Sequence, residues 1–306
     1  MIIDIDSIYS FHQLGNRENQ EDSRYPNFDH PSNDNAAFAV CDGVGGCDKG
    51  EVASSTVCNR IGEILSTHKN TDSFDDNNFQ HVLNHAYKSL DKVSDSSNKG
   101  MGTTLTFLAF HSRGAMAAHI GDSRIYQIRP GEGIIFRSED HSLVNALLRS
   151  GNISPDSIKD HPKGNVITRC MSAQDGVRER DDASVVNLKD IAPGDYFLLC
   201  TDGVTGKVDE EELIELYNSD KTDEDKCKYL AAKCIDSADN NTAIQIHVGL
   251  VTIEPQEDSE DELFVEGQEI VKTAKIETKE DSVHDLSPLS EKTQSKLKSF
   301  FNRLFK

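Results

Sequence analysis

Short apolar runs that end in an acidic residue recur through most of this chain. The runs AFAVC, AMAAHI and YFLLCT are each followed by an acidic turn, at Asp42-Gly43, Gly121-Asp122 and Asp202-Gly203. Further on, Asp239-Asn240 precedes the apolar stretch AIQIHVGLV. Short apolar runs bounded by turn residues are typical of buried β-strands. The pattern therefore predicts strands that deliver carboxylates to the rim of a sheet.

Each acidic turn taken singly has an ordinary explanation, because Asp-Gly pairs are preferred in turns. Several of them gathered at one rim would instead form an oxygen-rich pocket for hard divalent cations. The formal net charge is -21 and the pI is near 4.8, which argues against a nucleic-acid partner, since phosphate backbones attract basic surfaces. An acidic pocket also repels phosphate, so a phosphorylated substrate would require bound cations to reverse the local field.

The order of the expected elements favours an α+β fold. Apolar residues recur at helical spacing over 51–68, 79–93, 209–217 and 223–235. Strand patterns cover 8–14, 37–41, 103–110, 115–120, 124–128, 134–137, 184–188, 196–201 and 242–253. Turn signals at Arg113-Gly114 and Pro130-Gly131 predict antiparallel pairing of consecutive strands. Such runs of strands with paired helices favour an α+β sandwich over a parallel doubly wound fold.

The cysteines indicate a reducing compartment. The chain has seven, an odd number, and no pair has the two-residue spacing of a zinc knuckle or redox motif. Cys41 and Cys200 end apolar runs and are expected to be small core residues. With no signal peptide and no transmembrane run in the sequence, we expect reduced thiols in a cytoplasmic protein.

The sequence changes character after residue 254. An acidic block over 257–262 predicts disorder, whereas 290–306 is basic, with Leu297, Phe300, Phe301 and Leu304 on one helical face. Such an end could contact a membrane, a partner or the chain's own acidic domain. We expect a domain over 1–254 and a separate tail over 255–306.

Nine stretches together resemble one family. They are GNRENQED (15–22), DGVGG (42–46), KGEVAS (49–54), GTT (102–104), GDSR (121–124), DHS (140–142), TRCMS (168–172), CTDG (200–203) and DNNT (239–242). In this order they resemble the metal-dependent protein phosphatases, the PPM-type or type 2C serine/threonine phosphatases, in their compact bacterial form. The resemblance covers residues 8–253.

The resemblance implies a four-layer α/β/β/α sandwich, with two antiparallel sheets packed centrally and paired helices on each outer face. It implies hydrolysis of phosphoserine and phosphothreonine on proteins without a phosphoenzyme. It also implies a flap over about 141–182, which fits a function-bearing loop. The expected partners are phosphorylated proteins and a cognate serine/threonine kinase, with no nucleic acid, and the chain is expected to be a monomer.

The resemblance also assigns the metal ligands. Asp42 would bridge two cations, Mn²⁺ or Mg²⁺, which together would activate a shared water for in-line attack. One cation would also be bound by Asp202 and Asp239, and the other by Glu21 and the Gly43 carbonyl. Asp22 would hold a metal-bound water, and Asp122 would bind a third, weaker cation.

Two further assignments concern phosphate and proton transfer. Arg17 would hold the phosphoryl oxygens, because its planar fork suits phosphate; its ordinary alternative is a surface arginine. Many eukaryotic relatives carry a proton-donating His where this chain has Val44, so another group must be the acid. His141 and His161 could approach the pocket, although a structural role is commoner for a histidine.

Two other readings stay open at this point. One is a pseudophosphatase, in which a metal-binding carboxylate would be missing, whereas every such position in this chain carries an acidic residue. The other is an interaction protein in which the domain mainly presents the terminal amphipathic segment.

Overall fold

The computed structural model describes residues 1–44, 49–94, 101–154, 161–173 and 180–253. Contacts within the chain group residues 1–256 into one unit. The tail expected over 255–306 lies outside the described residues, and so do parts of the DGVGG stretch and of the flap.

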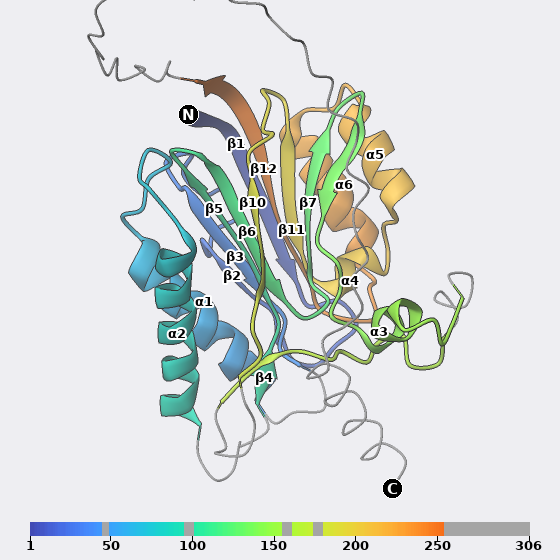
Figure 1. The fold of residues 1–306 in the computed structure, drawn as a ribbon. Helices are drawn as coiled ribbons and strands as arrows, with labels where there is room; N and C mark the ends of the chain where they lie inside the picture. The colour runs from blue at the N-terminus through green and yellow to red at the C-terminus, as the bar shows by residue number, and fades with distance from the viewer. Residues whose placement is uncertain (45–48, 95–100, 155–160, 174–179, 254–306) are drawn as a thin grey trace, which may run out of the picture. The chain divides into compact units, whose positions relative to one another are not determined.

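Two antiparallel sheets of five strands form the centre of this unit (Figure 1). The first sheet has the order β1-β12-β11-β7-β8, with the bounds Ile2–Gln13, Asn241–Thr252, Tyr196–Cys200, Arg124–Arg129 and Gly133–Arg137. The second has the order β10-β6-β5-β3-β2, with the bounds Ser184–Leu188, Gly114–Ile120, Leu105–His111, Ala37–Cys41 and Ser23–Tyr25. A short third pair joins β4 (Gly102–Thr103) to β9 (Met171–Ser172). The expected mixed α and β fold with antiparallel sheets is confirmed.

The central strands are apolar throughout because both of their faces are covered. In β3, Phe38 and Val40 pack with residues of the first sheet, while Ala37 and Ala39 pack with residues of two helices. In β11, Phe197 and Leu199 join the core between the sheets, and Leu198 joins a third core beneath helices. Successive side chains of a strand point to opposite faces. A continuous apolar run is therefore what a strand covered on both faces requires.

Helices cover the outer side of each sheet (Figure 1). α1 (Gly50–Leu65) and α2 (Asp76–Val93) pack on the second sheet, and the Asp75 side chain caps α2 by accepting from the Asn78 amide. α4 (Asp202–Thr205), α5 (Glu210–Asn218) and α6 (Asp223–Cys234) pack on the first sheet. α3 (Leu143–Arg149) lies in the segment expected to form the flap.

The structure confirms the two predicted hairpins and adds a crossover between them. β5 pairs with β6, and β7 pairs with β8. β6 and β7 belong to different sheets, so the GDSR stretch carries the chain from one sheet to the other. The first strand begins at Ile2, earlier than the expected residue 8, and β2, β9 and α4 were not expected. Elements of two to four residues are too short to have a readable period.

Two further findings concern the cysteines and the membrane. Cys41 and Cys200 are buried at the ends of β3 and β11, as expected of small core residues. Among the residues that the structure describes, no helix has both the length and the apolar character needed to cross a bilayer.

Candidate metal centre

Antiparallel pairing gathers the predicted site residues at one end of the sheets. Gln13 at the end of β1 lies opposite Asn241 at the start of β12, and Cys200 at the end of β11 lies opposite Arg124 at the start of β7. In the second sheet, Cys41 at the end of β3 lies opposite Ser23 at the start of β2, and the Gly43 amide donates to the Glu21 carbonyl. The segments that leave or enter these strands therefore meet. They carry Arg17, Glu21, Asp22, Asp42, Gly43, Asp122, Asp202 and Asp239.

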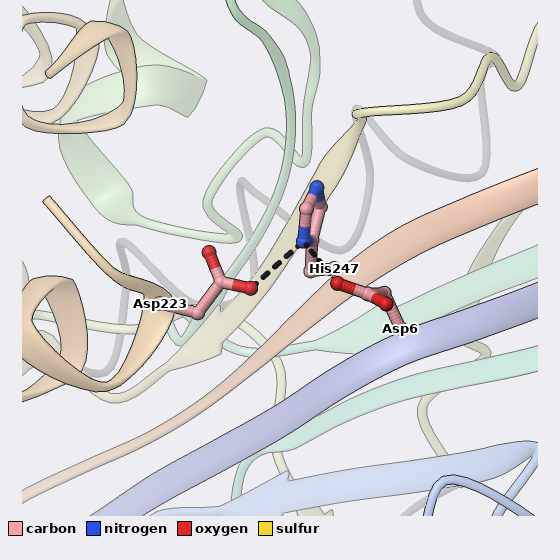
Figure 2. A group of neighbouring side chains, drawn as sticks. All are labelled: Asp6, Asp223 and His247. Atoms are coloured by element: carbon pink, nitrogen blue, oxygen red, sulfur yellow. Dashed lines mark hydrogen bonds and ion pairs between the residues drawn. The ribbon is translucent and has the colours of Figure 1, made fainter. Parts of the chain in front are cut away.

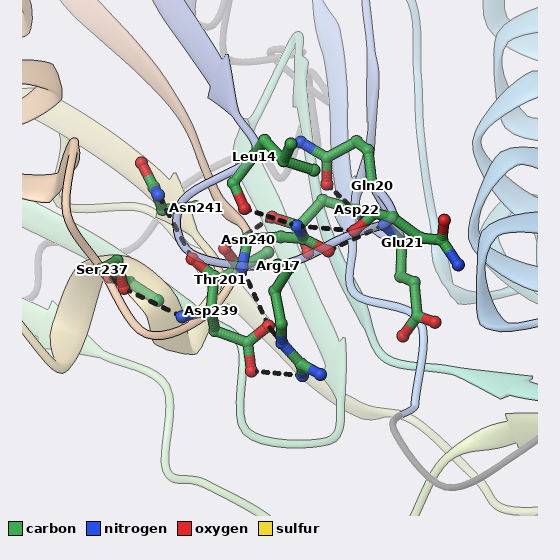
Figure 3. Close-up of polar contacts among 12 residues, drawn as sticks. Leu14, Arg17, Gln20, Glu21, Asp22, Thr201, Ser237, Asp239, Asn240 and Asn241 are labelled. Carbon is green, nitrogen blue, oxygen red and sulfur yellow. Dashed lines mark hydrogen bonds and ion pairs between the residues drawn. The ribbon is translucent and has the colours of Figure 1, made fainter.

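Asn240 holds the loop that carries the first three of these residues (Figure 3). Its amide nitrogen donates to the carbonyls of Leu14 and Asn19 at 2.8 and 3.0 Å, and its Oδ1 accepts from the Glu21 amide at 2.8 Å. Asn240 is buried, so these bonds are shielded from competing water. Sequence reasoning missed this role, although the residue lies within the DNNT stretch that carried part of the resemblance.

Asp22 is a buried carboxylate with one oxygen unused. Its Oδ2 accepts from the Thr201 hydroxyl at 3.0 Å, while its Oδ1 is buried and has no hydrogen-bond partner in the described part of the chain. Burial, with smaller contributions from the charges of Asp202 and Asp239, raises the pKa of Asp22 to about 7 against the hydrogen bond from Thr201. Thr201, a second residue that sequence reasoning missed, thus orients this carboxylate.

Asp42 is fixed through its backbone by the GTT stretch. Its amide donates to the Thr104 hydroxyl at 3.0 Å, and its carbonyl accepts from the Thr104 amide at 2.8 Å and the Thr103 hydroxyl at 2.9 Å. Burial raises the pKa of Asp42 well above its ordinary value, and the negative charges of Asp22 and Asp202 add to this effect.

Gly43 is required by close packing. A Cβ at this position would come within 2.6 Å of the Gly50 carbonyl carbon at the start of α1 and within 2.9 Å of the Glu21 Cβ. Its amide donates to the Glu21 carbonyl at 3.0 Å, which joins two predicted ligands of one cation. Burial raises the pKa of the Glu21 carboxyl as well.

The crossover between β6 and β7 and the start of α4 add two more carboxylates with a raised pKa, Asp122 and Asp202. Burial raises the pKa of Asp122 to about 7, and the charges of Asp202 and Asp140 contribute. Burial also raises the pKa of Asp202, with a further contribution from Asp239, and its Oδ1 is buried without a partner among the described residues. These carboxylates are buried or half-buried and repel one another, and Asp22 and Asp202 each keep an oxygen unused among the described residues. Such a group is the donor set of a hard divalent cation. The residues present fit such a group.

Arg17 is paired with one of the predicted ligands. Its Nε and Nη2 donate to the two carboxylate oxygens of Asp239 at 2.7 and 2.8 Å (Figure 3). Both side chains are partly exposed, at 43% and 35%, so the pair lies at the rim of the group. Arg17 is thus brought to the site, as expected, but its fork faces a carboxylate in place of a phosphoryl group.

The ring of His141 is neutral, and both of its nitrogens already have partners in the structure. Its Nδ1 accepts from the Gly121 backbone amide at 3.1 Å, which can only donate, so the ring proton is on Nε2, where Ser184 Oγ lies at 2.9 Å. Burial lowers the pKa of His141 to about 3, with help from His119 and Arg169. His161 accepts from the Lys163 amide within a turn of the flap segment. The structural alternative holds for His141.

A second group of possible ligands lies elsewhere, on β1, α6 and β12 (Figure 2). His247 Nδ1 lies 2.8 Å from Asp223 Oδ2 and 3.4 Å from Asp6 Oδ2. Ser7 and Tyr196 also donate to Asp223, each at 2.6 Å. These hydrogen bonds already use both oxygens of Asp223, and the group is about 20 Å along β12 from Asn241 at the rise per residue of a strand. We interpret it as the link between α6 and the first sheet.

Comparisons with known proteins agree with this geometry. The sequence profile of protein phosphatase 2C matches residues 12–232. Protein phosphatase PhpP of Streptococcus pneumoniae is 35% identical over 193 residues, which are 62% of this chain and 76% of PhpP. Serine/threonine phosphatase stp of Listeria monocytogenes is 31% identical over 204 residues, which are 63% of this chain and 76% of that protein.

Solved structures extend the likeness to the fold. A bacterial serine phosphatase superimposes with a TM-score of 0.67 at 26% identity, covering 81% of this chain and 100% of that one. The PstP/Ppp phosphatase of Mycobacterium tuberculosis superimposes with a TM-score of 0.66 at 25% identity, covering 79% and 98%. The catalytic domain of PstP, solved with two manganese ions, gives 0.63 at 25% identity and covers 79% and 98%. The chain belongs to the protein phosphatase 2C family.

Proposed function

We propose that this chain hydrolyses phosphoserine and phosphothreonine in proteins with the help of divalent cations. The observation that carries the proposal is the group of buried and half-buried carboxylates at the strand ends. Burial raises the pKa values of Asp22, Asp42 and Asp122, and repulsion from neighbouring carboxylates adds to the effect. The relatives named as serine/threonine phosphatases supply the substrate class.

The ligand set follows the resemblance. We propose Mn²⁺ or Mg²⁺ as the cation, two per chain with a third at lower affinity, and the manganese complex of the related PstP domain supports this. When bound, these cations would supply a nucleophilic water of lowered pKa and would neutralise charge on the phosphoryl group. Asp42 would be shared between them. The other ligands would be Asp202, Asp239, Glu21, the Gly43 carbonyl and, for the third cation, Asp122.

Asp22 and Arg17 would act on the attacking water and on the substrate. The unused Oδ1 of Asp22 can accept a proton from a water molecule, and the Thr201 hydroxyl keeps the carboxylate in place. Arg17 would bind the phosphoryl oxygens as a fork. Since both of its donating groups now meet Asp239, the substrate must draw the guanidinium away from that carboxylate or share it.

The leaving alkoxide needs a proton from a group other than residue 44 and His141. Val44 has no proton to give, and both ring nitrogens of His141 are engaged at a pKa of about 3. We therefore propose that a water molecule protonates the leaving group.

The finer architecture belongs to the same proposal. The three cores described above support the four-layer α/β/β/α sandwich, with α1 and α2 on one outer face and α4 to α6 on the other. We propose residues 1–254 as the catalytic domain, with the flap at 141–182 and the tail at 255–306. The kinase partner, the monomeric state and the contacts of the tail stay predictions.

Turnover of a phosphothreonine peptide tests the proposal. The purified chain should hydrolyse it with Mn²⁺ and stop in excess EDTA. Asp202→Asn should lose at least about a hundredfold in kcat/KM, since a carboxylate ligand of one of the two cations is removed. Asp34→Asn, which changes an exposed carboxylate, should behave as the wild type. Full activity in EDTA would exclude a metal mechanism, and no turnover with any divalent cation would favour a pseudophosphatase.

A further inference from the structure

The entrance of the flap touches the crossover that carries Asp122. The His141 amide donates to the Gly121 carbonyl at 2.9 Å, and the Gly121 amide donates to the His141 ring at 3.1 Å. Residue 121 is therefore held through both of its backbone groups by one residue. Asp122 is the next residue in the chain, so its backbone position depends on this contact.

Gly121 occupies a position that only a glycine fits. Its φ is +105°, a conformation that side chains rarely adopt, and a Cβ would come within 2.6 Å of the Thr104 Cγ2. With no side chain to pack, the turn relies on the hydrogen bonds of its backbone. An unpaired buried amide would cost the full desolvation of that group, so the His141 ring matters energetically as well as geometrically.

The His141 ring is itself fixed on its other sides. It stacks on His119 of β6, with ring centres 4.5 Å apart and an angle of 12°. Its Nε2 lies 2.9 Å from the Ser184 hydroxyl at the start of β10. The side chain is buried. These contacts allow one orientation, in which Nδ1 faces Gly121.

The return of the flap segment meets the same residue. The His141 carbonyl accepts from the Thr168 amide at 2.7 Å and from the Thr168 hydroxyl at 3.0 Å. Ser142 forms a bridge with Ile167, and the Leu143 amide donates to the Val166 carbonyl. The start of the flap segment and its returning stretch at 166–168 are thus tied at residue 141, while the His141 side chain reaches Gly121.

We propose that His141 is a positioning residue that couples the flap to Asp122. A shift of the flap ends would move the His141 backbone and ring together, and with them the Gly121-Asp122 turn. Conversely, a cation held at Asp122 would steady the flap ends. This inference rests on the proposed role of Asp122 as a cation ligand.

Variants at 141 and 184 separate the contacts. His141→Leu removes the acceptor for the Gly121 amide and should weaken the lowest-affinity Mn²⁺ site by about tenfold or more, as loss of a residue that orients a ligand does. His141→Asn keeps an acceptor near the Nδ1 position and should retain most of that affinity. Ser184→Ala removes the Ser184 contact at Nε2, leaves the Gly121 contact at Nδ1 in place, and is the matched control. Calorimetric Mn²⁺ binding gives these affinities without reference to activity.

Amide hydrogen exchange tests the coupling in the unaltered protein. Saturating Mn²⁺ should increase protection at 121–122 and, together with it, at 141–143 and 166–168. In His141→Leu the two segments should respond independently. Protection that rises at 121–122 alone in the wild type, or a His141→Asn variant as impaired as His141→Leu, would overturn the inference. Loss of all Mn²⁺ binding in the wild type would instead overturn the proposed function.

Discussion

At the scale of the residue, the site is dominated by carboxyl groups whose surroundings disfavour the ionised form. Asp22 and Asp122 each have a pKa raised to about 7, chiefly by burial. An unfolded aspartate titrates near about 4. Below about pH 4 these carboxyl groups are protonated in the folded and the unfolded chain, so they do not affect the free energy of unfolding. Between about pH 4 and about pH 7 they ionise more readily in the unfolded chain, so they lower the free energy of unfolding increasingly as the pH rises.

This difference predicts how Mn²⁺ stabilisation depends on pH. Without cations, the two groups destabilise the folded chain progressively from about pH 4 to about pH 7, because the folded state binds their protons more tightly. Cations replace those protons. The rise in Tm on adding Mn²⁺ should thus be small at about pH 5 and large at about pH 8, as followed by thermal unfolding. An equal rise at both pH values would contradict the raised pKa values, and Asp22→Asn should reduce the difference between them.

The acidic site residues could be predicted from the sequence, whereas the residues that orient them could not. Asp42, Asp122 and Asp202 follow apolar runs, so a strand pattern is enough to place them at a rim. Thr201 and Asn240 organise the same site, but a threonine or asparagine in a turn usually serves the local backbone. Their roles depend on partners that the sequence pattern does not name.

At the scale of the element, α6 is fastened to the first sheet by one acidic residue. Burial opposes the charge of Asp223, but the hydrogen bonds from His247, Ser7 and Tyr196 outweigh it and hold the pKa of Asp223 well below its usual range. A depressed folded pKa contributes stability above the unfolded value of about 4, and this contribution is lost as pH falls below it.

Asp223→Ala should therefore lower the free energy of unfolding by about 2–3 kcal/mol at neutral pH, since it leaves several donors unpaired. Urea unfolding measures this, and the loss should shrink as the pH is lowered below about 4. Asp225→Ala changes an exposed acid in the same turn of α6 and is the control. Catalytic turnover should be retained, because this group lies on the middle of the strands. An equal loss in both variants would mean that the network contributes nothing specific.

Element boundaries were predictable to the extent that local patterns set them. The strand at 184–188 coincides with β10, and the helix expected over 223–235 differs from α6 by one residue. Which strands pair was readable only for the hairpins. β6 and β7 lie in different sheets, and the sequence does not predict this because both strands are similarly apolar. The sheet that each strand joins depends on packing in the whole domain.

At the scale of the whole molecule, the net charge of -21 should select among phosphorylated substrates. A phosphothreonine peptide with basic flanks should have a lower KM than one with acidic flanks, because the surface attracts the first and repels the second. The difference should fade as the salt concentration rises from about 0.02 M to about 0.3 M, where the screening length falls to a few ångströms. Steady-state kinetics on the two peptides at matched Mn²⁺ measures it, and a KM ratio that does not change with salt would contradict the argument.

Most strands and helices, and the acidic residues that follow them, could be predicted from the sequence because period, turn preference and charge are local properties. Three contacts could be seen only in the folded chain: Arg17 meets Asp239 across 222 positions of chain, the imidazole of His141 accepts from Gly121, and Gly43 leaves no room for a Cβ beside the start of α1. Each of these contacts joins residues that lie in different elements or loops. Such contacts are fixed by the packing of the sheets against one another, which no single segment encodes.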